Sequence, residues 1–269
     1  MTIARRDNQD GTVGRALSVL DLVADFGRPV RFSELLARAD LPKATLHRFL
    51  HSLTNQGMLT FDADRQTYAP GLRLVRLAHA AWAQSSLAPI ACRVLDQLAW
   101  DTGHTVHLAQ LDYGAVIYVD KRNAAQPVDM FAQSGKIGPA YCTGVGKAML
   151  AFLPDDAQAQ AMAQQAFFPH TPQTLTTPDA LRADLARVRA RGFAVDQQEH
   201  EPGIICLAAP IRSGQGRVIG AVSVTAQGDD AAALIPLAPV VMDAARDIAD
   251  LAATWRFPEM PQPDPRSLR

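Results

Sequence analysis

The stretch KATLHRFLHSLTNQ, residues 43–56, constrains the fold of this chain more than any other part of its sequence. Its apolar residues recur at positions i, i+3, i+4 and i+7, the spacing of one helix face. The pattern predicts a helix that buries an apolar stripe and turns its polar side to solvent. The buried stripe consists of Leu46, Phe49, Leu50 and Leu53. The outward residues are Lys43, Ala44, His47, Arg48 and His51, and Gly57 suits the position just past the helix.

Two further helices are expected before this one. Residues 13–26 predict an amphipathic helix, because their apolar side chains also lie at helical spacing. Those side chains are Val13, Leu17, Leu20, Val23 and Ala24. Ser33 is expected to cap a short helix over residues 34–39. The turn Asp40-Leu41-Pro42 then leads into the third helix, with Pro42 placed to start it.

A β-hairpin is expected directly after the third helix. Residues 58–69 alternate apolar and polar side chains, and Asp62-Ala63-Asp64 supplies a turn between the two halves. A short helix, a tight turn, an amphipathic helix and a hairpin together describe a winged helix-turn-helix, a fold that binds DNA.

The distribution of charge agrees with such a role. The net charge of −1 taken alone argues against a nucleic-acid-binding protein. Residues 1–80, however, hold 11 Lys and Arg against 8 Asp and Glu, whereas residues 81–269 hold 15 against 19. A basic head on an acidic body indicates two domains with different partners.

The outer face of the third helix offers groups that suit DNA. Lys43 and Arg48 can neutralise phosphates or donate to guanine edges, and Thr45 and His47 can hydrogen-bond to phosphates or bases. Ala44 is small enough to allow close approach. A helix face with ordinary solvated charges is the alternative, and it applies equally to Arg65 near the hairpin tip.

Residues 13–71 resemble the DNA-binding domain of the isocitrate lyase regulator (IclR) family. The resemblance is carried by Gly14-Arg15-Ala16-Leu17, by the segment PKATLHRFL (residues 42–50), and by Tyr68-Ala69-Pro70-Gly71. It implies a DNA-binding transcription regulator that acts as a dimer or tetramer on a palindrome-like operator. Arg15 and Ser33 then join the expected DNA-contacting residues.

The remainder of the chain is expected to form a linker helix and a larger α+β domain. The linker helix covers residues 72–85 and the larger domain residues 86–256, while residues 257–269 are proline-rich and expected to be disordered. Two hairpins are predicted, over 105–121 and 204–225, with helices between them, which indicates an antiparallel sheet with helices against it. Helices are expected over 86–101, 144–152, 155–165, 179–191 and 234–255. The resemblance extends over residues 13–255 and implies a GAF-like effector-binding domain.

The segment YCTGVGK, residues 141–147, is the first candidate for a small-molecule site. Thr143 is a suitable N-cap, and the backbone N–H groups of Gly144 and Val145 would suit a carboxylate. The segment lacks the GxxxxGK[ST] spacing of a nucleotide-binding loop. Met130 and Tyr141 are candidates for an apolar wall, although core packing is the alternative role for both, and Cys142 lies beside them.

Residues 192–206 resemble the family pattern at Gly192, Asp196, Glu199 and Cys206. The match continues to Ile211, and the chain departs from the family pattern at Arg212-Ser213. The resemblance implies that Asp196 and Cys206 line the effector pocket together with Ser223 and Thr225, which lie two apart on one strand. With Thr143, Gly144 and Val145 they would form a polar cup. Such a cup favours a small hydroxy acid, keto acid or sugar acid, since an apolar ligand would leave polar groups unpaired.

Two other functions are alternatives to a ligand-controlled DNA-binding protein. A cysteine-dependent enzyme acting on small keto acids would use Cys206 as nucleophile, with His200 or Glu199 as base. A protein–protein adaptor would use the winged helix for docking. The cysteine and histidine spacing predicts no metal site, and no cofactor is expected. The scattered cysteines and the absence of a long apolar run indicate a cytoplasmic protein with no membrane segment.

Overall fold

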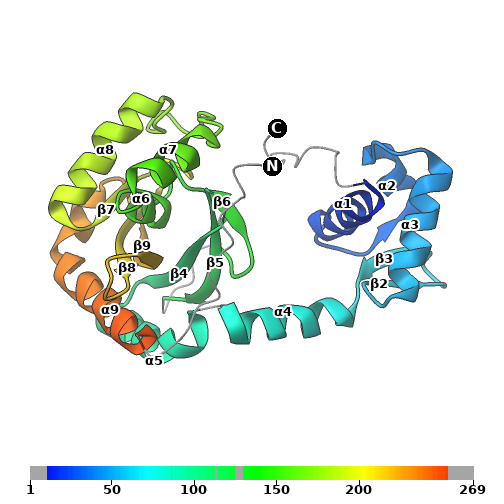
Figure 1. Cartoon of the computed structure of the whole chain (residues 1–269), viewed down its shortest axis with the longest axis horizontal. Coiled ribbons are helices and arrows are strands. Elements are labelled where there is room, and N and C mark those ends of the chain that lie inside the picture. The colour runs from blue at the N-terminus through cyan, green and yellow to red at the C-terminus, as the bar shows by residue number, and fades with distance from the viewer. Residues whose placement is uncertain (1–10, 86, 113, 125–129, 254–269) are drawn as a thin grey trace. The chain divides into compact units, whose positions relative to one another are not determined.

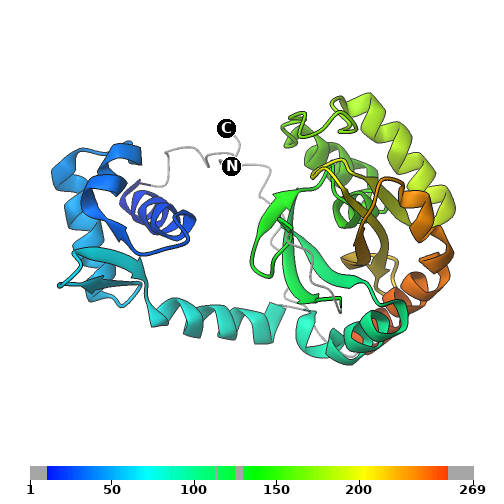
Figure 2. The ribbon, with the colours of Figure 1, turned by 180° about the vertical axis from the view of Figure 1, so that it is seen from behind.

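We describe the protein from a computed structural model, in which residues 11–85, 87–112, 114–124 and 130–253 are placed (Figures 1 and 2). The chain divides into two compact units, with the division between residues 83 and 84. The predicted disordered tail, residues 257–269, lies outside the described residues.

The first unit combines helices with a small antiparallel sheet. Its elements are α1 (Gly11–Asp25), β1 (Val30–Arg31), α2 (Phe32–Arg38), α3 (Lys43–Asn55), β2 (Leu59–Asp62) and β3 (Thr67–Pro70). The strands lie in the order β1-β3-β2, so the predicted hairpin is confirmed, and β1 adds a strand that the sequence did not indicate. The hairpin turn is fixed by Asp62, whose Oδ1 accepts hydrogen bonds of 3.0 Å from the backbone N–H groups of Asp64 and Arg65.

The core of this unit confirms the pattern that predicted α3. All four residues of the apolar stripe are buried, and they pack with Val19, Leu20 and Val23 of α1. The residue after the C-cap of α3 is Gly57, with a φ of 69° that favours glycine. The stripe predicted for α1 is only partly right, because Val13 and Leu17 are 70% and 49% exposed.

The predicted start of the second helix is wrong by two residues. Helix α2 begins at Phe32, so Ser33 lies inside its first turn and does not cap it. The N-terminal end of α2 is instead stabilised by Glu34, whose Oε2 accepts a hydrogen bond of 3.0 Å from the backbone N–H of Arg31. A carboxylate in the first turn satisfies a free N–H group and interacts favourably with the helix dipole.

Helix α4 (Leu72–Ser85) spans the residues predicted for the linker helix, and the division between the units falls within it. Its apolar side chains Leu72, Val75 and Leu77 are 81%, 65% and 46% exposed.

The second unit is built on a six-stranded antiparallel sheet in the order β6-β5-β4-β9-β8-β7. The two predicted hairpins are confirmed as β4 (Thr105–Asp112) with β5 (Ala115–Arg122), and β8 (Ile204–Arg212) with β9 (Val218–Gln227). Strands β4 and β9 pair with each other and join the hairpins into one sheet. The short outer strands β6 (Ile137–Pro139) and β7 (Ala194–Gln197) were not expected.

Helices cover both faces of this sheet (Figure 1). Helices α5 (Ala88–Thr102) and α9 (Ala238–Ala252) pack on one face, and α6 (Gly144–Leu150) packs on the other with α8 (Pro178–Arg191) behind it. Helix α7 (Asp155–Ala163) contributes Ala161 and Met162 to the core on the α6 side. The strands alternate accordingly: Val106, Leu108 and Leu207 belong to the α5–α9 core, whereas Cys206 and Ala208 belong to the α6 core.

The start predicted for the last helix, residue 234, is wrong. Residues Ala231–Leu237 form a 3₁₀ helix, η1, and α9 begins only at Ala238. Pro236 and Pro239 explain the change, because each lacks the N–H group that a continuous α-helix requires. Trp255, the predicted end, lies outside the described residues.

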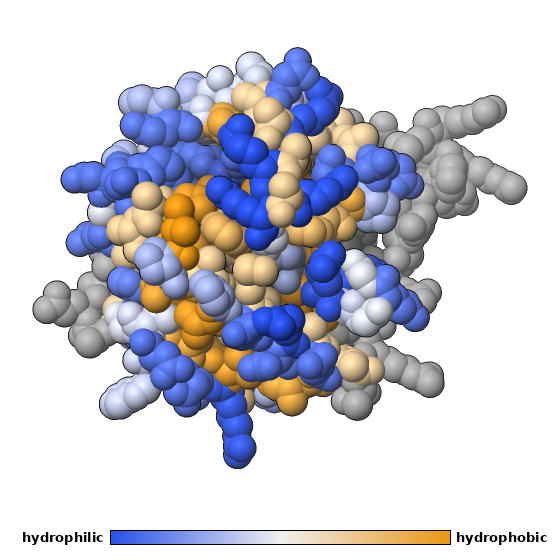
Figure 3. Space-filling view, turned by 90° about the vertical axis from the view of Figure 1, so that its left-hand side faces the viewer, coloured by the Kyte–Doolittle hydropathy of each residue, from blue (hydrophilic) through white to orange (hydrophobic). Residues whose placement is uncertain are grey.

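The side of this unit that carries α8 and α9 mixes charged and apolar residues on its surface (Figure 3). Within the described ranges, no helix is long and apolar enough to cross a membrane.

Candidate functional site

The N-terminal half of α3 presents a polar face to solvent, as the sequence predicted. Lys43, Ala44, His47 and Arg48 are exposed, and Thr45 is half-buried. We call these four exposed residues the α3 face. Leu46 and Phe49 lie on the opposite side and fix the helix to its core. The α3 face therefore offers two cationic side chains and an imidazole to solvent; the His47 ring lies 6.0 Å from the Phe32 ring, and the Arg48 guanidinium lies 5.8 Å from the Phe49 ring.

The three DNA-contact candidates outside α3 are also exposed. Arg15 lies on α1 and Ser33 on α2, and both are accessible to solvent. Arg65 lies in the hairpin turn with 79% of its side chain exposed, and its Nε is 4.0 Å from Asp62 Oδ2. An ion pair this exposed contributes little to the stability of the fold. Arg65 can therefore leave Asp62 and pair with another anion.

The second unit encloses a cavity of about 40 Å³ on the α6 side of the sheet. Strand register creates its floor: Asp196 lies opposite Cys206, Cys206 opposite Thr225, and His107 opposite Ser223. The wall comes from the start of α6 and from the segments 130–132 and 200–204. The complete lining is His107, Tyr118, Met130, Phe131, Ala132, Thr143, Gly144, Val145, Asp196, His200, Glu201, Ile204, Cys206, Ser223 and Thr225.

Eight of the effector-site candidates named from the sequence line this cavity. They are Met130, Thr143, Gly144, Val145, Asp196, Cys206, Ser223 and Thr225. The other three, Tyr141, Cys142 and Glu199, are not among the lining residues. Tyr141 donates a hydrogen bond of 2.6 Å to the backbone oxygen of Phe168, Cys142 is fully buried in the core, and Glu199 pairs with Lys147. Their side chains are used for packing and internal pairing.

His107 is the lining residue that sequence reasoning overlooked most clearly. It is 1% exposed, and its imidazole has a partner at each nitrogen: Nε2 lies 3.3 Å from the backbone oxygen of Ala132 and Nδ1 lies 3.2 Å from Thr225 Oγ1. Burial, with a smaller effect of Lys121, lowers the pKa of His107 to about 3. A polar residue within an apolar strand was the available signal, but the pairing of β4 with β9 was needed to place it.

His200 and Glu201 reach the cavity from the turn between β7 and β8. Thr171 and Thr174 anchor this turn, since their hydroxyl groups donate to the backbone oxygens of Gln198 and Glu199 at 2.7 Å and 2.6 Å. Glu201 accepts a hydrogen bond of 3.0 Å from the backbone N–H of Phe131. Burial and the neighbouring His170 lower the pKa of His200 to about 4.

Asp196 is the buried acid of the cavity. Its Oδ1 accepts a hydrogen bond of 2.8 Å from the backbone N–H of Glu199, and its carboxylate also accepts one from the backbone N–H of Gly144. Burial, and then the negative charge of Glu199, raise the pKa of Asp196 to about 7 in spite of these bonds. Asp196 thus gains or loses its proton near neutral pH.

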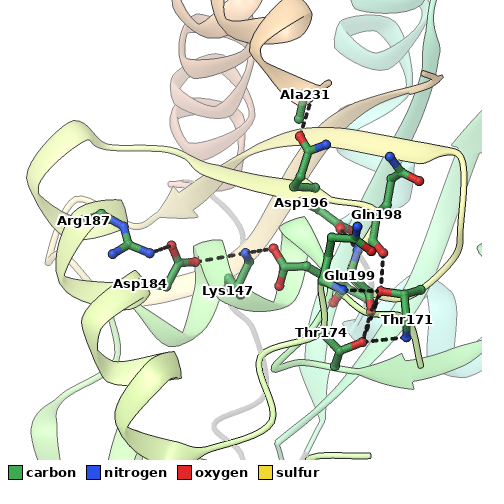
Figure 4. Close-up of polar contacts among 12 residues, drawn as sticks. Lys147, Thr171, Thr174, Asp184, Arg187, Asp196, Gln198, Glu199 and Ala231 are labelled. Atoms are coloured by element: carbon green, nitrogen blue, oxygen red, sulfur yellow. Dashed lines mark hydrogen bonds and ion pairs between the residues drawn. The ribbon is translucent and has the colours of Figure 1, made fainter. Parts of the chain in front are cut away.

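A buried ion network lies behind the cavity wall (Figure 4). Lys147 is 1% exposed; its Nζ contacts Glu199 and lies 2.9 Å from Asp184 Oδ2, and Arg187 pairs with the other oxygen of Asp184 at 2.8 Å. Burial alone would lower the pKa of Lys147, but Glu199, Asp184 and Asp196 together raise it. The lysine of the GVGK segment therefore stays charged and ties α6 to α8 and to the turn that carries His200 and Glu201.

The start of α6 is held differently from the prediction. Thr143 does occupy the N-cap position, but its hydroxyl makes no capping bond and instead donates to the backbone oxygen of Pro139 at 2.8 Å. The sequence predicted that the backbone N–H of Gly144 is available to a ligand. In the structure this N–H donates a hydrogen bond to the carboxylate of Asp196. A Cβ atom at Gly144 would lie 2.8 Å from Cys206 Sγ, so glycine allows the helix to approach β8.

The chemistry of the remaining candidates does not favour catalysis or metal binding. Burial, and then the charge of Asp196, raise the pKa of Cys206 to about 12, which disfavours the nucleophilic thiolate. Among the residues that the structure describes, no group of three His, Cys, Asp or Glu side chains is arranged to hold a metal ion.

Comparison with known proteins identifies the class to which these two units belong. The family model described as "Bacterial transcriptional regulator IclR C-terminal" matches residues 79–249, and the one described as "IclR helix-turn-helix domain" matches residues 12–63. The chain belongs to the IclR family. It is a transcriptional regulator with a DNA-binding helix-turn-helix domain and a C-terminal effector-binding domain, and the enzyme hypothesis is not retained.

Individual relatives cover most of the chain. The HTH-type transcriptional regulator BhcR of Paracoccus denitrificans is 32% identical over 238 residues, which are 87% of this chain and 85% of the relative. The crystal structure of Thermotoga maritima IclR has a TM-score of 0.71 at 27% identity and covers 90% of this chain and 98% of its own. An IclR homolog from Microbacterium hydrocarbonoxydans, crystallised with 4-hydroxybenzoate, shares the fold at a TM-score of 0.77 and 23% identity over 89% of this chain and 98% of its own.

Proposed function

We propose that the α3 face binds the major groove of a palindrome-like operator and that the cavity binds a small carboxylate effector that changes operator affinity. The observation that carries the DNA half is the exposure of Lys43, His47 and Arg48 on one side of a helix whose other side is buried. Thr45 would add a hydroxyl contact, Arg15 and Ser33 would contact phosphates, and Arg65 would reach the backbone or minor groove from the hairpin tip.

The effector half is supported by the polar lining of the cavity. Asp196, Ser223 and Thr225 are buried side chains with groups that can donate or accept further hydrogen bonds to a polar ligand. Thr143, Gly144 and Val145 surround the same space, with Cys206 and Met130 completing it. The Microbacterium homolog with 4-hydroxybenzoate supports a carboxylate ligand, since that protein has the same fold.

The proposal includes a homodimer or tetramer, because one helix-turn-helix reads a single half-site and a palindrome needs two. We assign residues 12–71 to DNA binding, 72–85 to the linker and 86–256 to effector binding. An effector shifts operator affinity only by the difference in its own affinity for the two states of the regulator. Because the operator is chromosomal, the proposal places the protein in the cytoplasm.

The DNA half is tested by selecting binding sites for the full-length protein from random double-stranded DNA. We expect a palindrome-like sequence to emerge and to bind roughly 10³-fold or more tightly than competitor DNA, with salt-sensitive affinity. Equal affinity for selected and random DNA would contradict it and would favour the adaptor hypothesis.

The effector half is tested by a thermal-shift screen of the full-length protein with pyruvate, lactate, gluconate and 4-hydroxybenzoate. A ligand at about 100 times its Kd is expected to stabilise the folded state by about 2.7 kcal/mol. Asp196→Ala should abolish the shift, whereas Asp179→Ala, on the exposed start of α8, should not. Stabilisation of both variants alike would show that the ligand binds elsewhere.

A further inference from the structure

Two acids and two imidazoles are among the side chains that line the cavity. Asp196 and Glu201 both line it, and no lysine or arginine is among the described residues that do. A ligand carboxylate that enters would face two carboxyl groups without a cation to balance it. Bringing like charges together in a buried space is unfavourable, so one of the groups must become neutral.

The nearby buried cation does not supply the missing positive charge. Lys147 lies behind the wall, where Glu199 and Asp184 already occupy its ammonium group, and it does not line the cavity. Withdrawing it toward a ligand would leave the buried Glu199 without its cation and Asp184 with Arg187 alone, which is more costly than protonating one acid.

The imidazoles are poor sources of positive charge as well. The Nε2 of His107 lies against a backbone oxygen, which only accepts, so in the neutral ring Nε2 carries the proton and Nδ1 accepts from the hydroxyl of Thr225. His200 packs against Phe131 and His170, with ring centroids 4.9 Å and 4.7 Å away. An apolar ring on one side and a second imidazole on the other disfavour the charged form of His200.

We infer that the cavity binds its acidic ligand together with one proton, which is held between the ligand carboxylate and the carboxyl group of Asp196. The inference rests on the proposed function of the cavity. In this arrangement the Asp196 carboxyl donates through one oxygen to the ligand, while Oδ1 continues to accept from the backbone N–H of Glu199. The proton comes from solvent, and the bound pair carries one negative charge instead of two.

The surroundings of Asp196 make this acid easier to protonate than a solvent-exposed carboxylate. It is 6% exposed, and burial raises its pKa to about 7 before any ligand enters. A further negative charge at the ligand position would raise that pKa again. Several titratable and charged groups face Asp196 from the elements around it. They are Cys206 on β8, Tyr118 on β5, His107 on β4, Cys142 just before α6, Lys147 on α6, and Glu199, His200 and Glu201 in the turn after β7.

The expected signature is ligand affinity that falls as pH rises. Below about pH 7 Asp196 already carries the proton, so binding takes up little. Above that pH the free protein must acquire the proton on binding, and affinity is expected to fall up to tenfold for each pH unit. A ligand held by unprotonated groups alone would show no such slope between about pH 7 and pH 9.

Isothermal titration calorimetry on the full-length protein tests this with pyruvate, lactate, gluconate and 4-hydroxybenzoate. Each titration is repeated at about pH 6 and about pH 8.5 in two buffers of different ionisation enthalpy, which reports the number of protons taken up. We expect uptake near one proton at the higher pH and near zero at the lower. Binding without proton uptake at both pH values would overturn the inference while leaving the proposed effector function in place. Absence of binding by all four acids at both pH values would overturn both.

Two amide variants assign the proton to its acid. Asp196→Asn keeps an oxygen that can accept from the backbone N–H groups of Glu199 and Gly144 and offers a permanent donor to the ligand, so its ligand affinity should not depend on pH above about 7. Glu201→Gln is the matched control on the other lining acid, and it should retain the proton uptake and the slope. The opposite result, with the slope lost in Glu201→Gln and kept in Asp196→Asn, would contradict the assignment to Asp196.

Discussion

The α3 face and the cavity of the second unit carry opposite charges in opposite environments. Lys43 and Arg48 are exposed cations on a helix whose other side is packed, whereas Asp196 is an acid enclosed by β7, β8 and α6. Solvent screens the exposed cations until a polyanion displaces their counterions. In the cavity, burial itself changes the protonation of the acid. As we propose, the same chain recognises DNA through exposed positive charge and, as we infer, an acidic ligand through a shared proton.

The largest effect is expected from the ion network that supports the cavity. Lys147→Met should destabilise the second unit by about 3–5 kcal/mol, because it leaves Glu199 buried without its cation and Asp184 with Arg187 alone. Urea unfolding of the full-length protein, followed by the transition of the second unit, measures the loss. Lys43→Met on the exposed α3 face is the matched control and should change stability by no more than about 0.5 kcal/mol. A loss below about 1 kcal/mol in Lys147→Met would mean that the network contributes little to the fold.

The next largest effect is expected on DNA binding. Lys43→Ala and Arg48→Ala should each weaken operator binding by about 1–3 kcal/mol, and the double variant should also reduce the salt dependence of the binding constant. Fluorescence anisotropy at several salt concentrations measures both. Arg182→Ala, on α8 of the second unit, removes an exposed arginine that we place outside the DNA contacts and should leave operator affinity unchanged. Equal affinities for the double variant and the wild type would remove the α3 face from the DNA interface.

A smaller effect is expected on the pH dependence of stability. Because the pKa of Asp196 is raised to about 7 in the folded protein, its contribution to stability is fully present below the pKa of the unfolded chain. That contribution is lost as pH rises toward 7, at a rate of roughly 1 kcal/mol per pH unit. Asp196→Asn removes the titration, so the difference in unfolding free energy between variant and wild type should shift in favour of the variant between about pH 5 and pH 7. A constant difference across this range would show that Asp196 titrates lower than the structure indicates.

The smallest effect is expected at the hairpin tip. Arg65→Ala should weaken operator binding by no more than about 1 kcal/mol, since the side chain is 79% exposed and its ion pair with Asp62 is weak. Competition binding against the wild type resolves a difference of this size. A loss as large as that of Arg48→Ala would make the hairpin, and not α3, the main source of DNA affinity.

The sequence predicted the first unit better than the second because its signals are local. The apolar stripe of α3 and the alternation in residues 58–69 arise from neighbours in the chain, and both are confirmed. The exposure of Val13 and the capping role of Glu34 were missed, because they depend on which turn of a helix meets its partner.

The cavity depends instead on contacts between distant segments. Ser223 and Thr225 could be predicted to share a strand face, and the family resemblance pointed to Asp196 and Cys206. The inclusion of His107 follows only from the pairing of β4 with β9, and that of His200 from the turn that Thr171 and Thr174 hold. That Glu199 does not line the cavity could likewise not be predicted without knowing that it pairs with Lys147.

The most direct test of the account measures both regions in one titration. Operator affinity of the full-length protein is determined by fluorescence anisotropy with the selected DNA, in the presence and absence of the most strongly stabilising acid of the thermal-shift screen. We expect that acid to change the operator Kd by about 5- to 150-fold in the wild type, the usual range of such coupling, and to have no effect on Asp196→Ala. An operator Kd that stays the same with saturating acid bound to the wild type would contradict the claim that the cavity controls DNA binding.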